Sequence, residues 1–134
     1  MSRTARAASI AGTALLVAAC LALVFVVPRS AATSSGETRV IHLGVHQMTY
    51  YMNGRTDPNP TLHIRRGERV RIVVRNEDPG MKHDFGIDDW QQRTRPIDGV
   101  GEARLEFVAP SAPGFVTYSC TPHGAMMRGT IQIE

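Results

Sequence analysis

The side chains with the clearest metal chemistry lie near the end of the 134-residue chain, in the run Cys120-Thr-Pro-His123-Gly-Ala-Met126-Met127. A further histidine, His83, stands well upstream, just after the turn residues Pro and Gly. Two imidazoles, one thiolate and one weak thioether suit copper, because soft sulfur donors bind Cu(I) and imidazole nitrogen binds Cu(II). The pattern therefore favours one mononuclear copper site.

A purely structural cysteine, or a different metal, fits the pattern less well. Cys120 is the only cysteine from residue 33 onward, and in an oxidising compartment a lone thiol must be buried, occupied or reactive. A single buried cysteine often acts as a small core residue. The combination Cys-x2-His-x3-Met-x-Gly with an upstream histidine favours an occupied site. Zinc accepts a thioether poorly, and a binuclear copper centre would need two cysteines in this loop.

The remaining histidines, His42, His46 and His63, are expected to be surface or hydrogen-bonded residues on or beside strands. His46, Met48 and Met52 offer donors for a second soft-metal site, with His42 nearby, but their spacing is not diagnostic. The sequence shows no acid–base pair, phosphate-binding loop or open metal position. These observations favour a copper-binding or electron-transfer protein over an enzyme.

The elements that must position the candidate ligands are strands. From residue 39 the chain breaks into short runs rich in Val, Ile, Thr, Phe and Tyr, separated by Gly, Pro, Asn and Asp. This pattern is typical of an all-β, two-sheet sandwich. Residues 88–101 show no strand pattern and are expected to form a long surface connection with a helical turn. The expected strands cover residues 40–48, 61–64, 69–76, 83–87, 103–108, 114–120 and 128–133.

Side-chain parity tests whether the ligands can meet, because successive residues of a strand point to opposite faces. Cys120 shares a face with the apolar Tyr118, so this face is expected inside and Ser119 outside. His83 shares a face with Phe85. Both ligands are then expected at the end of the core, above its apolar layer.

Parity also separates the two methionines of the loop. On the strand expected over residues 128–133, the small and apolar residues Gly129, Ile131 and Ile133 are in register with Met127. Met126 falls in the polar set. Parity therefore selects Met127 as the axial ligand.

Residues 1–32 have the composition of a targeting segment, with Arg3 and Arg6 ahead of an uncharged run over residues 7–27. The run is long for a cleaved signal peptide and long enough for a membrane anchor helix, so both interpretations stay open. Lipidation at Cys20 is a weaker third one. Each places the folded part outside the cytoplasm, in the periplasm or on the outer face of the membrane.

The charge distribution argues against nucleic-acid binding. The net charge of +3 comes from the leader, because Arg3, Arg6 and Arg29 account for the whole surplus. Residues 33–38 are expected to form a flexible tether, and residues 39–134 a single domain. We expect this domain to be a monomer with no nucleic-acid partner, and its balanced charge argues against strong long-range steering of a protein partner.

These residues resemble the type 1 (blue) copper cupredoxin family, which includes plastocyanin, azurin and amicyanin. The resemblance covers residues 39–134. The Cys-Thr-Pro-His run is similar to amicyanin's loop, His-x3-Met-x-Gly-Thr to azurin's spacing, and Gly-Met-Lys-His-Asp-Phe to the family's first-histidine strand. The resemblance implies a Greek-key β-sandwich in which His83, Cys120 and His123 are the equatorial copper ligands and Met127 is the long axial one.

The resemblance also implies a function. The protein would be an extracytoplasmic carrier with one copper ion per chain, transferring single electrons between redox partners as the ion alternates between Cu(I) and Cu(II). Partners would dock near His123, whose ring edge is expected to reach solvent through a small apolar collar. The alternative is a copper-binding module for delivery, storage or resistance. Cys120 favours the carrier, because delivery sites are often built from Met and His alone.

One position departs from the family pattern. Family members often have Asn or Ser directly after the first histidine, and this chain has Asp84. We expect the Asp84 carboxylate to accept hydrogen bonds near Thr121 and to support the cysteine loop, as residues behind metal ligands commonly do.

Overall fold

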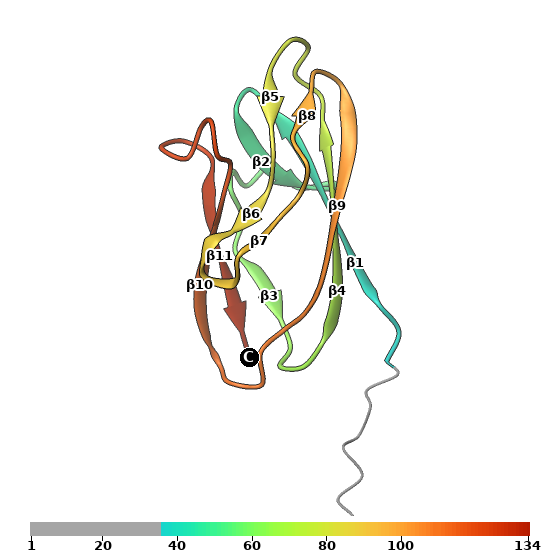
Figure 1. The fold of residues 1–134 in the computed structure, drawn as a ribbon, viewed down its shortest axis with the longest axis vertical. Helices are drawn as coiled ribbons and strands as arrows, with labels where there is room; N and C mark the ends of the chain where they lie inside the picture. Colours follow the sequence, from blue (N-terminus) through green and yellow to red (C-terminus); the bar gives the residue numbers. More distant parts are fainter. Residues whose placement is uncertain (1–35) are drawn as a thin grey trace, which may run out of the picture. The chain divides into compact units, whose positions relative to one another are not determined.

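The structure is a computed structural model that describes residues 36–134. The predicted leader over residues 1–32, with its anchor or signal, lies outside the described residues. Within residues 36–134 no helix is long and apolar enough to cross a membrane. The described chain forms two facing β-sheets and a small third one (Figure 1), which confirms the predicted all-β sandwich.

The first sheet contains four strands in the order β2-β1-β4-β9. β1 (Arg39–His46) and β4 (Arg69–Asn76) run parallel, while β2 (Thr49–Met52) and β9 (Gly101–Val108) are antiparallel to the strands that they flank. Alternate residues of β9 are buried, as expected for a sheet with one face on the core and one in solvent.

The second sheet contains five strands in the order β3-β11-β10-β6-β7. β3 (Leu62–Ile64) is parallel to β11 (Arg128–Ile133), and the other neighbours are antiparallel. β10 (Gly114–Ser119) lies at its centre, while β6 (Gly86–Ile87) and β7 (Gln92–Arg93) form a short edge. The connection from β10 to β11 leaves the sandwich as a separate loop (Figure 1).

The single strand predicted over residues 83–87 is wrong, because this segment changes partner along its length. β5 (Lys82–His83) pairs with β8 (Ile97–Asp98) in the small third sheet, whereas β6 pairs with β10 and β7. Between the two, the Phe85 N–H donates to Oγ1 of Thr94 at 3.0 Å rather than to a neighbouring strand. The break separates the fully buried His83 from the five-stranded sheet.

The predicted surface connection over residues 88–101 contains the expected helical turn, the 3-10 helix η1 (Asp88–Trp90). It also contains β7 and β8, which the sequence analysis did not predict. Each has only two residues, too few for an alternation of apolar and polar side chains to be recognised. Trp90 packs edge-on against Phe107 with ring centroids 5.2 Å apart, as a packing residue would.

The strand predicted over residues 40–48 ends at His46, and β2 follows after a two-residue turn that the sequence did not reveal. Gln47 and Met48 have φ values of +50° and +54°. Two-residue hairpin turns need such values and strongly prefer Asn-Gly, so Gln-Met gives no signal. Both turn N–H groups donate to the carboxylate of Asp78, at 2.8 and 3.1 Å.

Aromatic rings join the two sheets beneath the candidate ligands. Tyr50 of β2 packs edge-on against Tyr118 of β10 at 5.5 Å, and Phe85 stacks on Tyr118 at 5.0 Å. All three are fully buried, and the Tyr50 hydroxyl donates to the backbone oxygen of Asp84. The surrounding core is aliphatic and comes from both sheets: Ile41, Leu43, Val45, Leu62, Ile64, Val70, Ile72, Val74, Leu105, Ile131 and Ile133.

The parity prediction for β10 is wrong at Ser119. This residue was expected on the solvent face, yet it is buried, with 8% of its surface exposed. Ser119 pairs with Gly86 on one side and with Arg128 on the other, and the guanidinium of Arg93 lies directly against Gly86. Long side chains thus cover the outer face of the sheet at this end.

Candidate metal centre

Three predicted ligands converge at one end of the sandwich. His83 comes from the end of β5, Cys120 directly follows β10, and His123 lies in the β10–β11 loop. The Cys120 Sγ atom is 3.7 Å from Nδ1 of His83 and 3.8 Å from Nδ1 of His123, and the two Nδ1 atoms are 3.2 Å apart. His83 and Cys120 are fully buried and His123 is half-buried. One sulfur and two ring nitrogens therefore face a common point.

The loop that contains Cys120 and His123 is closed by its own backbone. The Cys120 N–H donates to the Met127 oxygen at 3.0 Å, and the Met127 N–H donates to the His123 oxygen at 2.8 Å. From outside the loop, Nδ2 of Asn59 donates to the Met126 oxygen at 2.9 Å. These contacts return the chain into β11 with a fixed separation between Cys120 and His123.

The two methionines of the loop differ in burial. Met127 is fully buried, whereas 53% of the Met126 surface is exposed. This difference agrees with the strand parity that selected Met127. Met127 is part of the hydrophobic core cluster that also contains Cys120.

The Asp84 carboxylate makes the contact expected of it. Its Oδ1 accepts the Thr121 N–H at 2.7 Å, which ties the residue after His83 to the residue after Cys120. The Asp84 N–H also lies 3.5 Å from the Cys120 sulfur. Oδ1 accepts a second bond from Nη1 of Arg93 at 3.0 Å, a partner that the sequence analysis did not identify because Arg93 lies in the segment without a recognisable pattern.

Asp78 is a second residue that the sequence analysis missed. Its Oδ2 lies 3.3 Å from Nε2 of His83, on the side of the ring away from Cys120. Asp78 follows β4 in a turn with Pro and Gly, where an aspartate is a common turn residue. The turn alone is therefore a sufficient reason for an aspartate here, without any role at the site.

The pKa values of the two buried predicted ligands are shifted in opposite directions. Burial, together with the nearby His123, lowers the pKa of His83, so its ring is neutral at pH 7. Burial raises the pKa of the Cys120 thiol, so the thiol remains protonated until a metal ion replaces the proton. A neutral imidazole and a thiol that ionises on coordination are the forms that metal binding requires.

The other histidines are separate from this cluster. His42, His46 and His63 are exposed, and within residues 36–134 only His83, Cys120 and His123 form a group of three or more His, Cys, Asp or Glu side chains with converging ligand atoms. Met48 and Met52 pack against the core.

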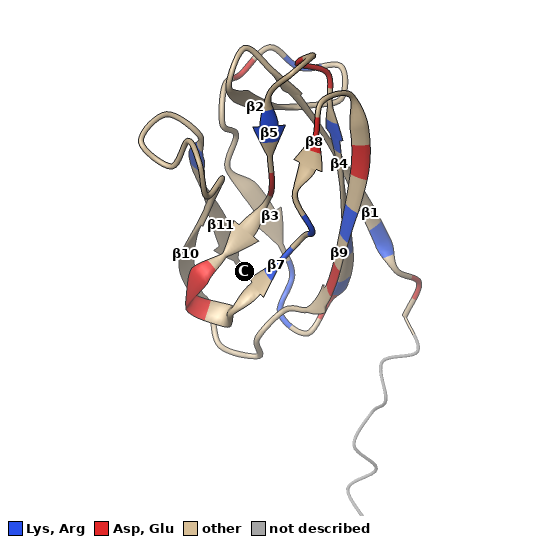
Figure 2. Cartoon of the chain, turned by 45° about the horizontal axis from the view of Figure 1, so that its top comes forward, with Lys and Arg blue, Asp and Glu red and all other residues tan. Residues whose placement is uncertain are grey.

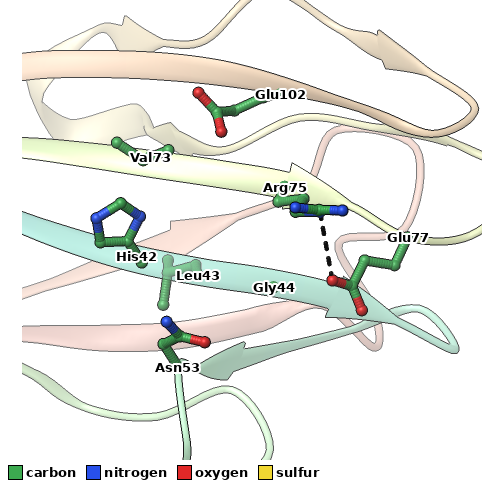
Figure 3. A pocket seen from close by; sticks show the side chains of 8 residues that line it. All are labelled: His42, Leu43, Gly44, Asn53, Val73, Arg75, Glu77 and Glu102. Atoms are coloured by element: carbon green, nitrogen blue, oxygen red, sulfur yellow. Dashed lines mark ion pairs between the residues drawn. The ribbon is translucent and has the colours of Figure 1, made fainter.

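His42 lies on the outer face of β1, where it lines a pocket (Figure 3). Arg75 and Glu77 form an ion pair at 3.5 Å at the other end of this pocket. The pocket is lined mainly by charged and polar groups of the four-stranded sheet. His42 is exposed, as was expected.

Solved structures similar to this chain are blue copper proteins. Auracyanin A from the green thermophilic photosynthetic bacterium Chloroflexus aurantiacus has a TM-score of 0.55 and 17% identity, over 73% of this chain and 100% of its own. Reduced auracyanin from Roseiflexus castenholzii has 0.58 and 17%, over 74% and 99%. Reduced rusticyanin has 0.55 and 20%, over 75% and 81%.

No protein-family model and no curated protein sequence matches the chain. The structural similarity shows that residues 36–134 have the cupredoxin fold. The donor set fits copper on its chemistry, since thiolate and imidazole are ligands that copper accepts in either oxidation state. Fold and ligand cluster together support one copper ion per chain.

Proposed function

We propose that this protein is an extracytoplasmic type 1 copper protein that transfers single electrons between redox partners. The observation that supports the proposal best is the approach of one buried thiol sulfur to two imidazole Nδ1 atoms, at 3.7 and 3.8 Å. His83, Cys120 and His123 would bind copper as equatorial ligands, and Met127 would be the axial one. When bound, copper supplies the one-electron chemistry.

The residues around the ligands form a frame that limits movement. Backbone hydrogen bonds close the Cys120 loop. Asp84, which directly follows β5, accepts a hydrogen bond from the Thr121 N–H and so holds the start of this loop. Cys120 and His83 are fully buried, so water has no direct access to the sulfur. A frame held this firmly keeps ligand positions nearly the same in both oxidation states, and small rearrangement favours fast electron transfer.

The exposed part of the loop suits a transient partner. Pro122, Ala125 and Met126 are exposed around the half-buried His123, and the loop between β10 and β11 has no Lys, Arg, Asp or Glu before Arg128 (Figure 2). An uncharged apolar collar lets a partner approach the ring edge without desolvating charge. Electron-transfer encounters are typically small and short-lived.

The burial of Cys120 also bears on the alternative function. A protein that delivers, stores or detoxifies copper must release the ion, which requires an accessible site. Here the sulfur donor is fully buried and the loop is closed by hydrogen bonds at both ends. This favours the electron carrier. Location in the periplasm or on the outer face of the membrane is part of the same proposal and follows from the composition of residues 1–32.

The test is to add Cu(II) to the purified protein and to record its visible spectrum. We expect an intense thiolate-to-copper absorption band that bleaches with ascorbate and returns on reoxidation. Cys120→Ser should abolish the band, and His123→Ala should change its energy or intensity. His63→Ala, an exposed histidine on β3, is the matched control and should leave it unchanged. A weak band with rapid loss of copper to a chelator would instead support delivery.

A further inference from the structure

Nε2 of His83 occupies an unusual position for a polar atom. It is buried and makes no hydrogen bond of good geometry within the described residues. The group it faces is the carboxylate of Asp78, with Oδ2 at 3.3 Å. On the opposite side of the ring, Nδ1 faces the Cys120 sulfur. The imidazole therefore lies between a carboxylate and the candidate metal position.

The carboxylate is held in place by groups other than His83. Its oxygens accept the N–H groups of Gln47 and Met48, and the Asp78 N–H donates to Oδ1 of Asn76 at 3.0 Å. Asn76 is fully buried and also donates to the backbone oxygens of residues 81 and 99, each at 2.8 Å. Contacts that do not involve His83 thus hold Asp78 in place.

Asp78 is itself buried, with only 8% of its surface exposed, and its carboxylate oxygens accept the two turn N–H groups. A buried carboxylate accepts hydrogen bonds and cannot donate one.

A fixed acceptor of this kind selects one tautomer of the ring. With the proton on Nε2, the N–H faces the Asp78 carboxylate 3.3 Å away, and the Nδ1 lone pair is free to face the cysteine. With the proton on Nδ1, the Nε2 lone pair would face a carboxylate, and a buried polar group left unpaired costs about 1–3 kcal/mol. The first tautomer is the one that presents Nδ1 as a metal ligand.

We propose that Asp78 is a positioning residue for the copper site: its carboxylate holds the His83 proton on Nε2, directs Nδ1 to the metal, and strengthens the imidazole as a donor. This inference rests on the proposed copper function and adds to it a residue outside the predicted ligand set. Carboxylate partners of metal-bound histidines raise ligand basicity, and their removal typically lowers metal affinity about 10 to 100-fold.

A more basic imidazole stabilises Cu(II) more than Cu(I), because the higher charge gains more from a strong nitrogen donor. Removal of the Asp78 charge should therefore weaken Cu(II) binding more than Cu(I) binding, and the reduction potential should rise. A residue with only a structural role would not change the two affinities unequally.

The test uses Asp78→Asn in the full chain, which preserves side-chain shape and removes the negative charge. Because Asp78 also caps the Gln47–Met48 turn, a second variant, Asp78→Ala, is made in a Gln47→Asn background, where asparagine accepts the left-handed conformation of that position. His46→Ala is the matched control, since His46 Nδ1 lies 3.5 Å from the same carboxylate on its exposed side.

Two measurements decide the matter. In the metal-free protein, ring nitrogen NMR shifts of His83 should show the Nε2–H tautomer in the parent and in His46→Ala, and a mixture in the Asp78 variants. In the copper-loaded protein, the Asp78 variants should keep the thiolate band but bind Cu(II) about 10 to 100-fold more weakly, with a higher potential. An unchanged tautomer or an unchanged affinity overturns the inference. Absence of the band in the parent itself would instead refute the copper function.

Discussion

Two regions of the sandwich bury different kinds of side chain. In the four-stranded sheet, alternate residues of β1 and β9 are buried and those between them mostly face solvent. Where β5 and β10 end, the polar residues His83, Asp84 and Ser119 are buried instead. Apolar burial dominates the first region, whereas the second depends on particular hydrogen bonds. The scaffold and the site should therefore respond differently to substitution.

The largest contrast is expected between Ile72→Ala and Met127→Leu. Ile72 is a fully buried residue of β4, and its truncation should lower the free energy of unfolding by about 2–5 kcal/mol while leaving the copper spectrum unchanged. Met127→Leu nearly conserves volume and should cost less than about 1.5 kcal/mol, yet change the spectrum and potential. Urea denaturation and visible absorption measure the two effects, and a copper spectrum altered by Ile72→Ala would remove the contrast.

A smaller difference is expected between two arginines. Arg93 pairs with the buried Asp84, whose side chain is 5% exposed, whereas Arg71 pairs with the exposed Glu106 at 3.0 Å. Because Arg93 is itself partly in solvent, Arg93→Met should cost about 1–3 kcal/mol, below the full penalty for stranding a buried charge. Arg71→Met should cost less than about 1 kcal/mol. Equal losses in chemical denaturation would show that Asp84 does not depend on its arginine.

Two glycines in strands provide the next comparison. A Cβ at Gly129 of β11 would collide with the ring of Tyr118, which is fully buried and whose hydroxyl donates to the Pro60 oxygen at 2.6 Å. Gly129→Ala should destabilise by about 1–3 kcal/mol, as overpacking does. A Cβ at Gly44 of β1 meets no atom within 4 Å, and Gly44→Ala should be neutral or stabilise by up to about 1 kcal/mol. Thermal unfolding distinguishes the two, and a neutral Gly129→Ala would contradict the close approach.

The smallest effect concerns alkaline pH. Burial raises the pKa of Tyr118 above its usual value of about 10, so the folded state keeps a proton that the unfolded state loses. Stability should therefore fall as pH rises above about 10, by about 1.4 kcal/mol per pH unit for this group. Tyr118→Phe should have a shallower decline. Parallel stability curves for the wild type and Tyr118→Phe between pH 9 and 11 would contradict this assignment.

Sequence patterns predicted the scaffold well because alternation over six to eight residues leaves a readable signal, as in β1, β4 and β9. The strands that were missed have two to four residues, and β2 follows a Gln-Met turn that lacks turn-forming residues. Such elements exist because tertiary contacts stabilise them, with Asp78 capping the turn from a distant part of the chain.

The convergence of His83, Cys120 and His123 was predictable because their types and spacing are uncommon together, and strand parity placed Cys120 on an inner face. Their supports were only partly predictable. Asp84 adjoins a predicted ligand and was identified, whereas Asp78 lies in a turn and Arg93 in the two-residue strand β7. An aspartate is common in turns for purely local reasons, and a two-residue strand leaves no readable pattern, so only the three-dimensional arrangement reveals what these two residues contact.

The complete burial of Cys120 has a consequence for biogenesis. Its shielding requires β10 to have paired with both β6 and β11, and sandwiches rich in non-local pairing fold comparatively slowly. In an oxidising compartment, the location proposed for this protein, the Cys120 thiol would stay exposed until these pairings form. Cross-linking of two unfolded chains through this sulfur would then compete with closure of the sandwich.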